Sequence, residues 1–597
     1  MSDATSSRSL CLGVAQSLQG RAWYSIAADN QLVAALTRTL NLPDAVASIL
    51  AARGYTAETA EPFLNPTLRD LMPDPSSLAG MDEAVSRLVS AIENEENVVV
   101  FGDYDVDGAT SSALLIRFFR ALGVELGSYI PDRVKEGYGP NAPALLKLRN
   151  DGAAVAITVD CGITAFEPLS DAAGAGLDVV VIDHHKAEVR LPVAAAVVNP
   201  NRLDDTSGQG HLAAVGVTFL VIVGINRALR EAGWYERVGK TEPDLRTLLD
   251  IVSLGTVCDV VPLKGLNRAF VNQGLAIMAR GKNVGMVALA NAAGLKERPR
   301  AFHLGYMLGP RVNAGGRVGE ASLGTRLLSS DDPDEAAVLA MRLNEYNADR
   351  KDIEAAVLID AIEQAETEPD PNASMVFVSG ANWHPGVIGI VASRLRERYD
   401  LPACVVACDG GMAKGSGRSV PGVDLGRAIL DARDAGLLFN GGGHAMAAGF
   451  TVEQDRLGAF QTFLDEHVRQ QVESGGVQPS YIVDAVVTPE GATVDLIQNL
   501  ARLEPFGAGN DEPKIGIANA MVVKSDIVGS GHIRCIVTGS SGGRLKAIAF
   551  NSADSELGHA LLNTQGRPIH LAGSLREDNW QGRSDVQLVI DDGAWAA

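Results

Sequence analysis

Four short apolar runs without polar alternation stand out in the first half of the chain. They are separated by stretches in which apolar residues recur with helical spacing. The runs are NVVVF (97–101), AAVAITV (153–159), DVVVI (178–182) and AAAVV (194–198). Strands that are buried on both faces of a parallel sheet have this pattern, because helices cover both sides. The region 95–265 is therefore predicted to be a doubly wound α/β domain, and we extend this domain to residues 91–329.

The pattern changes on both sides of this domain. Residues 1–90 carry short amphipathic segments and are predicted to be a helical region. Residues 330–368 are predicted to form one long connecting helix, since Leu339, Leu343, Tyr346, Ile353 and Val357 follow three- and four-residue spacing. The segment PDPNAS should end it.

A second α/β lobe is expected over 369–472, opening with the apolar strand MVFVS. From 478 to 597 the chain alternates apolar and polar residues through YIVDAVV, IGIANAMVV, HIRCIV, LKAIAF and DVQLVID. Five or more short strands with Gly and Ser turns predict a small β-barrel. The fold class is thus α/β, with two α/β lobes joined by a long helix and followed by a barrel.

Composition narrows the class of protein. A chain of 597 residues is too long for one core and should form three or four domains. No apolar run approaches the roughly 20 residues of a membrane span, and the N-terminus lacks a signal-peptide layout, so we expect a cytoplasmic protein. The six cysteines lack disulfide or zinc spacing. The net charge of −22 argues against a large basic surface for duplex DNA but leaves room for a narrow basic groove.

Three carboxylates follow the first apolar run, in the loop FGDYDVDG. Asp103, Asp105 and Asp107 lie where a strand ends and a helix begins, which is where ligands bind in open α/β sheets. Carboxylates this close repel one another unless a cation neutralises them. A helix cap or an EF-hand-like calcium loop is the alternative, but the loop lacks the glycine and final Glu of an EF-hand.

The same arrangement recurs at two further strand ends. Asp160 ends the second run and Asp183-His184-His185 ends the third, while Asp259 in SLGTVCDVVPL could supply a last ligand. Several carboxylates with imidazole and no cysteine favour Mn²⁺, with Mg²⁺ as the alternative. We predict two cations, bridged by Asp160, in a site for phosphoryl chemistry.

Taken together, the motifs resemble a known superfamily. GDYDVDG, VDCG, DHH and VCDVVPL follow the order of the four motifs of the DHH phosphoesterases, and NWHPGVIGIVASRL, GSGRS and GGGHAMAAGF resemble the DHH-associated domain. GPRVNAGGRVGEA and LEPFGAGNDEP are similar to segments of the RecJ family of exonucleases. The resemblance implies a DHH lobe, a DHH-associated lobe and an oligonucleotide-binding (OB) type barrel.

The resemblance also implies roles for single residues. Asp105 and Asp107 would bind the two metals, His184 and Asp259 would complete the ligand set, and Asp103 would be a ligand or lie close to one. Asp160 would bridge the metals, and His185 would face the scissile phosphate. Some members of the superfamily have a His two positions before Asp103, where this chain has Phe101.

The substrate implied by the resemblance is a single DNA strand with a 5′ end. The groups expected to face it are Arg133, Arg311, Ser416, Arg418 and His444. Arg317 could join them or pair with Glu320. On the barrel, Arg534, Arg544, Lys546 and Phe550 could bind DNA or form an ordinary solvated face.

The activity that the resemblance implies is hydrolysis of single-stranded DNA from 5′ to 3′, with release of 5′-mononucleotides, in recombination and repair. The expected partners are a single-stranded-DNA-binding protein and a helicase, without a membrane, and the chain is expected to be a monomer. Two alternatives stay open: a superfamily member acting on dinucleotides or pyrophosphate, and a non-catalytic binding module that keeps the fold.

Overall fold

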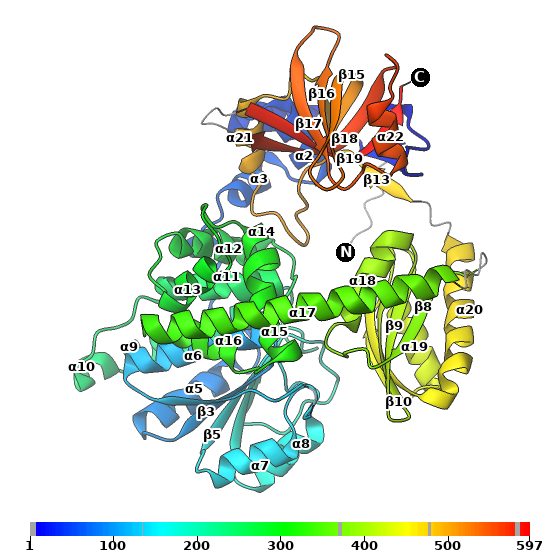
Figure 1. The fold of residues 1–597 in the computed structure, drawn as a ribbon. Coiled ribbons are helices and arrows are strands. Elements are labelled where there is room, and N and C mark those ends of the chain that lie inside the picture. Colours follow the sequence, from blue (N-terminus) through cyan, green and yellow to red (C-terminus); the bar gives the residue numbers. More distant parts are fainter. Residues whose placement is uncertain (1–7, 134, 368–372, 476–478, 579–584, 597) are drawn as a thin grey trace. The chain divides into compact units, whose positions relative to one another are not determined.

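The computed structural model describes residues 8–133, 135–367, 373–475, 479–578 and 585–596 (Figure 1). The chain forms two compact units. The larger unit consists of Pro73–Val261 and Phe270–Val477. The barrel unit consists of the chain up to Met72, the short segment Pro262–Ala269 and the chain from Gln478 onward.

A five-stranded parallel sheet forms the centre of the first lobe of the larger unit. The strand order is β4-β3-β5-β6-β7 and every neighbouring pair is parallel. The strands are β3 (Val98–Gly102), β4 (Leu126–Tyr129), β5 (Val155–Val159), β6 (Asp178–Ile182) and β7 (Ala196–Val198). β3 and β5 are buried along their whole length, which explains their unbroken apolar sequences. The predicted doubly wound α/β domain is confirmed.

Helices cover both faces of this sheet, as its buried strands require. They are α5 (Met81–Glu93), α6 (Val106–Leu122), α7 (Ala142–Asn150), α8 (Phe166–Gly174) and α9 (Ala214–Glu231). The helix α6 starts at the Asp105 cap, whose side chain accepts hydrogen bonds from the backbone amides of Asp107 and Gly108. It ends at Gly123, whose left-handed φ of 76° suits a glycine.

Between β7 and Ser330 the chain is mainly helical. The helices are α10 (Trp234–Val238), α11 (Leu249–Cys258), α12 (Gly265–Met278), α13 (Val284–Ala292), α14 (Ala301–His303), α15 (Gly309–Val318) and α16 (Leu323–Ser329). A π-helical turn, Leu304–Leu308, joins α14 to α15. These helices extend the first lobe well beyond its sheet.

The predicted long helix is present as α17 (Pro333–Thr367), the long green helix of Figure 1. It has 35 residues. Its first half packs on α13, α15 and α16, and its second half packs on α18 (Ile388–Tyr399) and β8 (Val376–Ala381) of the second lobe. Its buried side chains include Leu339 and Leu343 early and Val357 and Ala361 late, so one helix contributes to both lobes.

The second lobe is a mixed sheet with the order β11-β12-β10-β9-β8. Only β8 and β9 are parallel; the other pairs are antiparallel. The strands are β8 (Val376–Ala381), β9 (Ala403–Asp409), β10 (Met412–Arg418), β11 (Asn440–His444) and β12 (Ala447–Glu453). The helices are α18 (Ile388–Tyr399), α19 (Leu425–Asp434) and α20 (Leu457–Gly475).

The C-terminal strands close into a barrel in the order β15-β16-β17-β19-β18, with β18 pairing back to β15. They are β15 (Ile515–Val528), β16 (His532–Thr538), β17 (Arg544–Ala549), β18 (Ile569–Asp578) and β19 (Asp585–Trp595). A further strand, β14 (Ala485–Val487), pairs in parallel with β15. The associated helices are α21 (Val494–Ala501) and α22 (Glu556–Leu562). The predicted barrel is confirmed.

The N-terminal region is helical only in part. It contains α1 (Asn30–Leu40), α2 (Asp44–Ala52), α3 (Ala57–Leu64) and α4 (Leu68–Leu71), but also β1 (Arg8–Leu10) and β2 (Ala22–Ile26). β2 pairs in parallel with β13 (Ser480–Ile482), more than 400 residues further along the chain. The prediction of helix alone was therefore wrong for β1 and β2. β1 pairs with the nearby β2, and β2 pairs in turn with the remote β13, which leaves no local pattern.

The six cysteines are all free thiols, buried or half-buried. Within the described ranges no helix combines the length and the apolar character that crossing a bilayer requires.

Candidate metal centre and nucleic-acid site

The parallel strands β3, β5 and β6 deliver their acidic and imidazole groups to one edge of the sheet. Asp103 follows β3, Asp160 follows β5, and Asp183 follows β6. Their backbone amides continue the strand pairing, since Asp160 donates to Ile182 at 3.0 Å and Asp103 donates to Val159 at 3.3 Å. The carboxyl ends of parallel strands always share an edge, so groups far apart in sequence meet there.

The N-terminus of α6 positions the acidic loop. Asp105 accepts hydrogen bonds from the amides of Asp107 at 2.8 Å and Gly108 at 3.1 Å. Asp107 is buried and accepts from the amides of Ala214 and Val215, at the start of α9, at 2.6 and 2.8 Å. These bonds fix both carboxylates through the positive ends of two helices.

His184 is held in one tautomer. Its Nδ1 donates to the carbonyl oxygen of Leu212 at 3.0 Å, so the neutral ring presents an unprotonated Nε2. Burial, followed by the neighbouring His185, lowers the pKa of His184 to about 4, which keeps the ring neutral. Its Nε2 lies 3.3 Å from Asp160 and 3.5 Å from Asp259. A neutral imidazole fixed through its other nitrogen is the usual state of a metal-ligating histidine.

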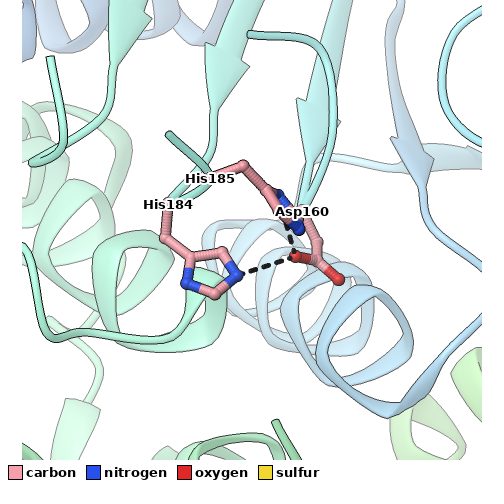
Figure 2. A group of neighbouring side chains, drawn as sticks. All are labelled: Asp160, His184 and His185. Atoms are coloured by element: carbon pink, nitrogen blue, oxygen red, sulfur yellow. Dashed lines mark ion pairs between the residues drawn. The ribbon is translucent and has the colours of Figure 1, made fainter. Parts of the chain in front are cut away.

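His185 is held differently, by Asp183. Its Nδ1 donates to the Asp183 carboxylate at 2.8 Å and lies 3.3 Å from the hydroxyl oxygen of Tyr138. Burial acts to lower the pKa of His185, but Asp183 outweighs it and the pKa is raised. Figure 2 shows both histidine rings turned towards the Asp160 carboxylate. The pKa values of His184 and His185 are therefore shifted in opposite directions although the residues are adjacent.

The backbone at Asp160 is in the left-handed region, with φ of 60°. Such a conformation is strained for a residue with a side chain and tends to occur at functional sites. Tyr138 donates its hydroxyl hydrogen to the Asp160 carbonyl at 2.9 Å and thereby supports this turn.

Three sets of side chains place one possible ligand atom each within 4.8 Å of the others. They are Asp160/His184/His185, Asp107/His184/Asp259 and Asp103/Asp105/Asp160. Two residues, Asp160 and His184, belong to more than one set. All six predicted metal ligands are thus brought together, and His185 joins one of the sets.

Several of these atoms are buried without a hydrogen-bond partner among the described residues. They are Asp103 Oδ1, Asp160 Oδ1, His184 Nε2 and Asp259 Oδ2. Burying polar atoms without partners costs about 1–3 kcal/mol each, more for charged groups. Burial, and after it repulsion from Asp105, raises the pKa of Asp107 to about 7 and pushes that of Asp160 upward. Divalent cations would satisfy every one of these groups, so the residues fit a metal centre of oxygen and imidazole ligands.

Unlike the predicted metal ligands, the predicted phosphate-binding groups do not form one cluster of contacts. The guanidinium carbon of Arg133 lies 4.8 Å from the ring centroid of Tyr104, which is a residue of the acidic loop. Arg418 donates to the hydroxyl of Ser416 at 3.1 Å. Arg311 donates to Asn344 at 3.0 Å and to the carbonyl of Met307 at 2.6 Å, and His444 is exposed at the end of β11. Arg133 thus contacts the acidic loop, and Ser416 is hydrogen-bonded to Arg418.

Arg317 does not pair with Glu320, which was one of the two expectations. It is largely buried and donates to the carbonyl of Gly386 at 2.9 Å. Burial, and after it the charges of Arg133 and Arg350, lowers the pKa of Arg317 to about 10. The clustered positive charges make this a place suited to an anion.

Two residues at the site were not predicted as functional. Asp183 orients His185, and Tyr138 contacts both His185 and Asp160. Asp183 could have been found from its place in the DHH triplet. Tyr138 lies in a loop whose path only the fold determines.

Family models match three parts of the chain. The DHH family N-terminal domain matches residues 97–256, the DHHA1 domain matches 372–470, and the RecJ OB domain matches 483–592. With the parallel sheet and its Asp/His cluster, the first two matches define a protein of the DHH–DHHA1 class.

Similarity to individual proteins shows to which family within the DHH–DHHA1 class the chain belongs. The chain is 35% identical to the single-stranded-DNA-specific exonuclease RecJ of Escherichia coli, over 92% of this chain and 96% of that protein. It is 34% identical to the Bacillus subtilis protein of the same name, over 96% of this chain and 70% of that one. The chain belongs to the RecJ family of single-stranded-DNA-specific exonucleases.

Solved structures of RecJ are similar to this chain over nearly its whole length. The RecJ structure from Thermus thermophilus in complex with Mn²⁺ has a TM-score of 0.79 and 29% identity, covering 96% of this chain and 79% of that one. A structure of RecJ from the same organism in complex with Mg²⁺ has a TM-score of 0.75 at 28% identity, covering 96% of this chain and 78% of that one.

Proposed function

We propose that this protein hydrolyses single-stranded DNA from the 5′ end by a two-metal mechanism and releases 5′-mononucleotides. The observation that carries the proposal is the convergence of buried, unpartnered ligand atoms from Asp103, Asp160, His184 and Asp259. Such atoms are costly unless cations bind them, and two adjacent cations suit in-line phosphoryl chemistry.

Asp160 is the proposed bridge, because it belongs to two of the three possible ligand sets. Asp105, Asp107 and Asp103 complete the ligands from the acidic loop, and His184 and Asp259 complete them from the other side. Two cations, with Mn²⁺ favoured and Mg²⁺ as the alternative, would supply an activated water and neutralise charge on the leaving oxygen.

His185 is proposed as the catalytic group that faces the substrate. Its Nδ1 is occupied by Asp183 at 2.8 Å, so its Nε2 is the nitrogen left for a phosphate oxygen. Asp183 also raises the pKa of His185 and therefore favours the protonated ring, which can donate to a developing negative charge. His185 thus orients and stabilises the phosphate while the other ligands hold the cations.

The 5′-terminal phosphate is proposed to bind Arg133, Arg311, Ser416, Arg418 and His444. The Ser416–Arg418 pair supports this, since a guanidinium beside a hydroxyl can bind a terminal phosphate with several hydrogen bonds. Binding the end of the strand rather than its interior would set the 5′→3′ polarity.

We further propose the functional limits of the domains. These are an N-terminal region over 1–90, a catalytic domain over 91–329, the connecting helix over 330–368, a DHH-associated domain over 369–472 and a nucleic-acid-binding barrel over 478–597. Cytoplasmic roles in recombination and repair, as a monomer working beside a helicase and a single-stranded-DNA-binding protein, complete the proposal.

The test is degradation of 5′- and 3′-labelled single-stranded, duplex and RNA substrates with Mn²⁺ or Mg²⁺. We expect degradation of single-stranded DNA from its 5′ end. Asp160→Ala should lose at least the roughly 10- to 100-fold that even outer-sphere changes cost at metal sites. Asp171→Ala is the matched control, because Asp171 is an exposed carboxylate on α8 of the same lobe.

Equal activity of Asp160→Ala and Asp171→Ala would contradict the metal-bridging role. Preference of the wild type for dinucleotides or pyrophosphate would move the assignment to a small-substrate phosphodiesterase. Binding of single strands without any hydrolysis would favour a non-catalytic module.

A further inference from the structure

Two large aromatic side chains lie exposed beside each other at the start of a helix that leads to the metal site. Phe302 is 55% exposed and Tyr306 is 74% exposed. Their ring centroids are 5.0 Å apart with an interplanar angle of 27°, so the rings are stacked. Exposed adjacent aromatic rings usually mark a binding surface, because water solvates them poorly.

The backbone beneath these rings is unusual. The helical run Ala301–Val318 consists of α14, a π-helical turn at Leu304–Leu308 and α15. Single π-helical turns inside α-helices are rare and occur frequently at functional sites. Tyr306 lies within this turn and Phe302 directly precedes it, so the irregularity coincides with the aromatic pair.

The chain just before the pair is basic and exposed. Lys296, Arg298 and Arg300 all have exposed side chains, although the protein as a whole carries a net charge of −22. The one acidic residue among them, Glu297, lies 3.2 Å from Nε2 of His303. A local excess of positive charge in an acidic protein complements a polyanion.

This surface is connected to the metal centre at two points. The first is the end of α11, where the thiol of Cys258 donates to the carbonyl of Leu304 at 3.4 Å and Asp259 follows directly. The second is the acidic loop, where a Cβ at Gly316 would lie 2.5 Å from the carbonyl oxygen of Tyr104. The helical run that carries Phe302 and Tyr306 thus contacts one segment that adjoins Asp259 and another that adjoins Asp103 and Asp105.

We propose that Phe302 and Tyr306 form a nucleobase-stacking site for the single strand, outside the metal centre, with Lys296, Arg298 and Arg300 binding the adjacent phosphates. The inference rests on the proposed function, because the strand is the substrate of that site. Stacking on aromatic rings beside basic groups is how proteins hold single strands without sequence preference. Bases that are paired in a duplex keep their faces covered and cannot use such a site.

The length of the strand decides whether it contacts the pair, because the proposed stacking site lies outside the metal centre. A trinucleotide whose 5′ end occupies the metal centre should not reach the pair, whereas a dodecanucleotide should.

The test compares the double variant Phe302→Ala/Tyr306→Ala with the unchanged pair, both in an Asp160→Ala background so that the DNA is not degraded. Binding of 3′-labelled oligonucleotides is measured by fluorescence anisotropy with Mn²⁺. We expect a loss of about tenfold to hundredfold in affinity for the dodecanucleotide, the size of stacking losses for one base. Affinity for the trinucleotide should be unchanged.

Two controls separate stacking from other effects. Val338→Ala/Met341→Ala removes exposed apolar side chains from α17 and should change neither affinity. Phe302→Tyr/Tyr306→Phe keeps both rings and should bind like the unchanged pair. A 2-aminopurine placed at successive positions should be quenched most beyond the third nucleotide in the unchanged protein and lose that quenching in the alanine variant.

Unchanged affinity of the alanine variant for the dodecanucleotide would overturn the proposal, as would an equal loss for the trinucleotide. A change in oligomeric state without a change in DNA binding would show that the pair binds a second copy of the chain instead. Failure of the proposed function would look different: the wild type would not degrade single strands, while the binding measurement, made without turnover, would still decide the stacking site.

Discussion

Protons and metal ions compete for the buried carboxylates of the metal centre. Burial, and after it the charge of Asp105, raises the pKa of Asp107 to about 7. Burial, and after it the charge of Asp107, raises the pKa of Asp259 to about 9. His184 stays neutral, because burial lowers its pKa to about 4. In the absence of cations the carboxylates therefore keep protons that they would release on binding metal.

The stability of the protein should consequently depend on pH and metal together. Between the ordinary Asp pKa of about 3.9 and the raised values, the metal-free folded state holds more protons than the unfolded state, so its stability falls as pH rises. Cations need the ionised carboxylates, so the stabilisation they confer should grow over the same range. We expect the rise in Tm caused by Mn²⁺ to be larger at about pH 8.5 than at about pH 6.

Calorimetry or thermal fluorescence at several pH values checks this expectation, with Asp171→Asn as the control that should behave like wild type. Asp259→Asn should flatten the pH dependence. A metal-induced shift that is constant or shrinks with rising pH would contradict the account.

At the scale of elements, the close approach of α6 to the end of β3 forms the acidic loop. A Cβ at Gly108 would lie 2.4 Å from the carbonyl oxygen and 2.6 Å from the amide nitrogen of Asp103. Both contacts are with backbone, so the loop itself would have to move. Gly174, at the end of α8, has nothing within 4 Å of its Cβ position. A side chain at position 108 would therefore displace the loop, whereas a side chain at position 174 would meet no neighbouring atom.

Gly108→Ala should therefore destabilise the protein by about 1–3 kcal/mol, the usual range for overpacking. It should also weaken Mn²⁺ binding by roughly tenfold or more, because Asp103 and Asp105 lie on the displaced loop. Gly174→Ala should be neutral or stabilise by about 0.5–1 kcal/mol. Urea denaturation and Mn²⁺ titration measure both effects. Similar behaviour of the two variants would show that the loop tolerates a side chain at Gly108.

At the scale of the whole molecule, a buried arginine joins separate parts of the barrel unit. Arg268 lies in the inserted segment Pro262–Ala269 and donates to the carbonyls of Phe63, Leu503 and Glu504 at 2.6, 3.0 and 2.6 Å. Its guanidinium also lies 3.8 Å from the centre of the Phe63 ring. Burial lowers its pKa to about 10, which leaves it charged at neutral pH. One side chain thus donates hydrogen bonds to backbone carbonyl groups of chain segments that are distant in sequence.

Arg268→Met should cost about 3 kcal/mol or more, because it keeps the apolar volume but leaves several buried carbonyls without donors. Differential scanning calorimetry should show a clear fall in the Tm of the barrel unit. Lys264→Met, at an exposed position of the same segment, is the control and should shift the Tm little. Equal Tm values for the two variants would mean that the carbonyls find other donors.

Much of this architecture could be predicted because it depends on local pattern. Buried parallel strands require unbroken apolar runs, and α17 requires apolar residues at helical spacing. The cluster of Asp105, Asp107, Asp160 and His184 could be predicted too, since the carboxyl ends of parallel strands share an edge. The roles of single residues within that cluster came from family resemblance and stay proposals.

The sequence by itself determined the strands, the long helix, the barrel and the edge where acids and histidines gather, because those features follow from short-range periodicity and sheet geometry. Only the tertiary structure decided the pairing of β2 with β13, the carbonyl partners of Arg268, the opposite pKa shifts of His184 and His185, and the exposure of Phe302 and Tyr306. Each of these depends on contacts between residues distant in the chain or on what is left uncovered after folding, and no local pattern encodes either.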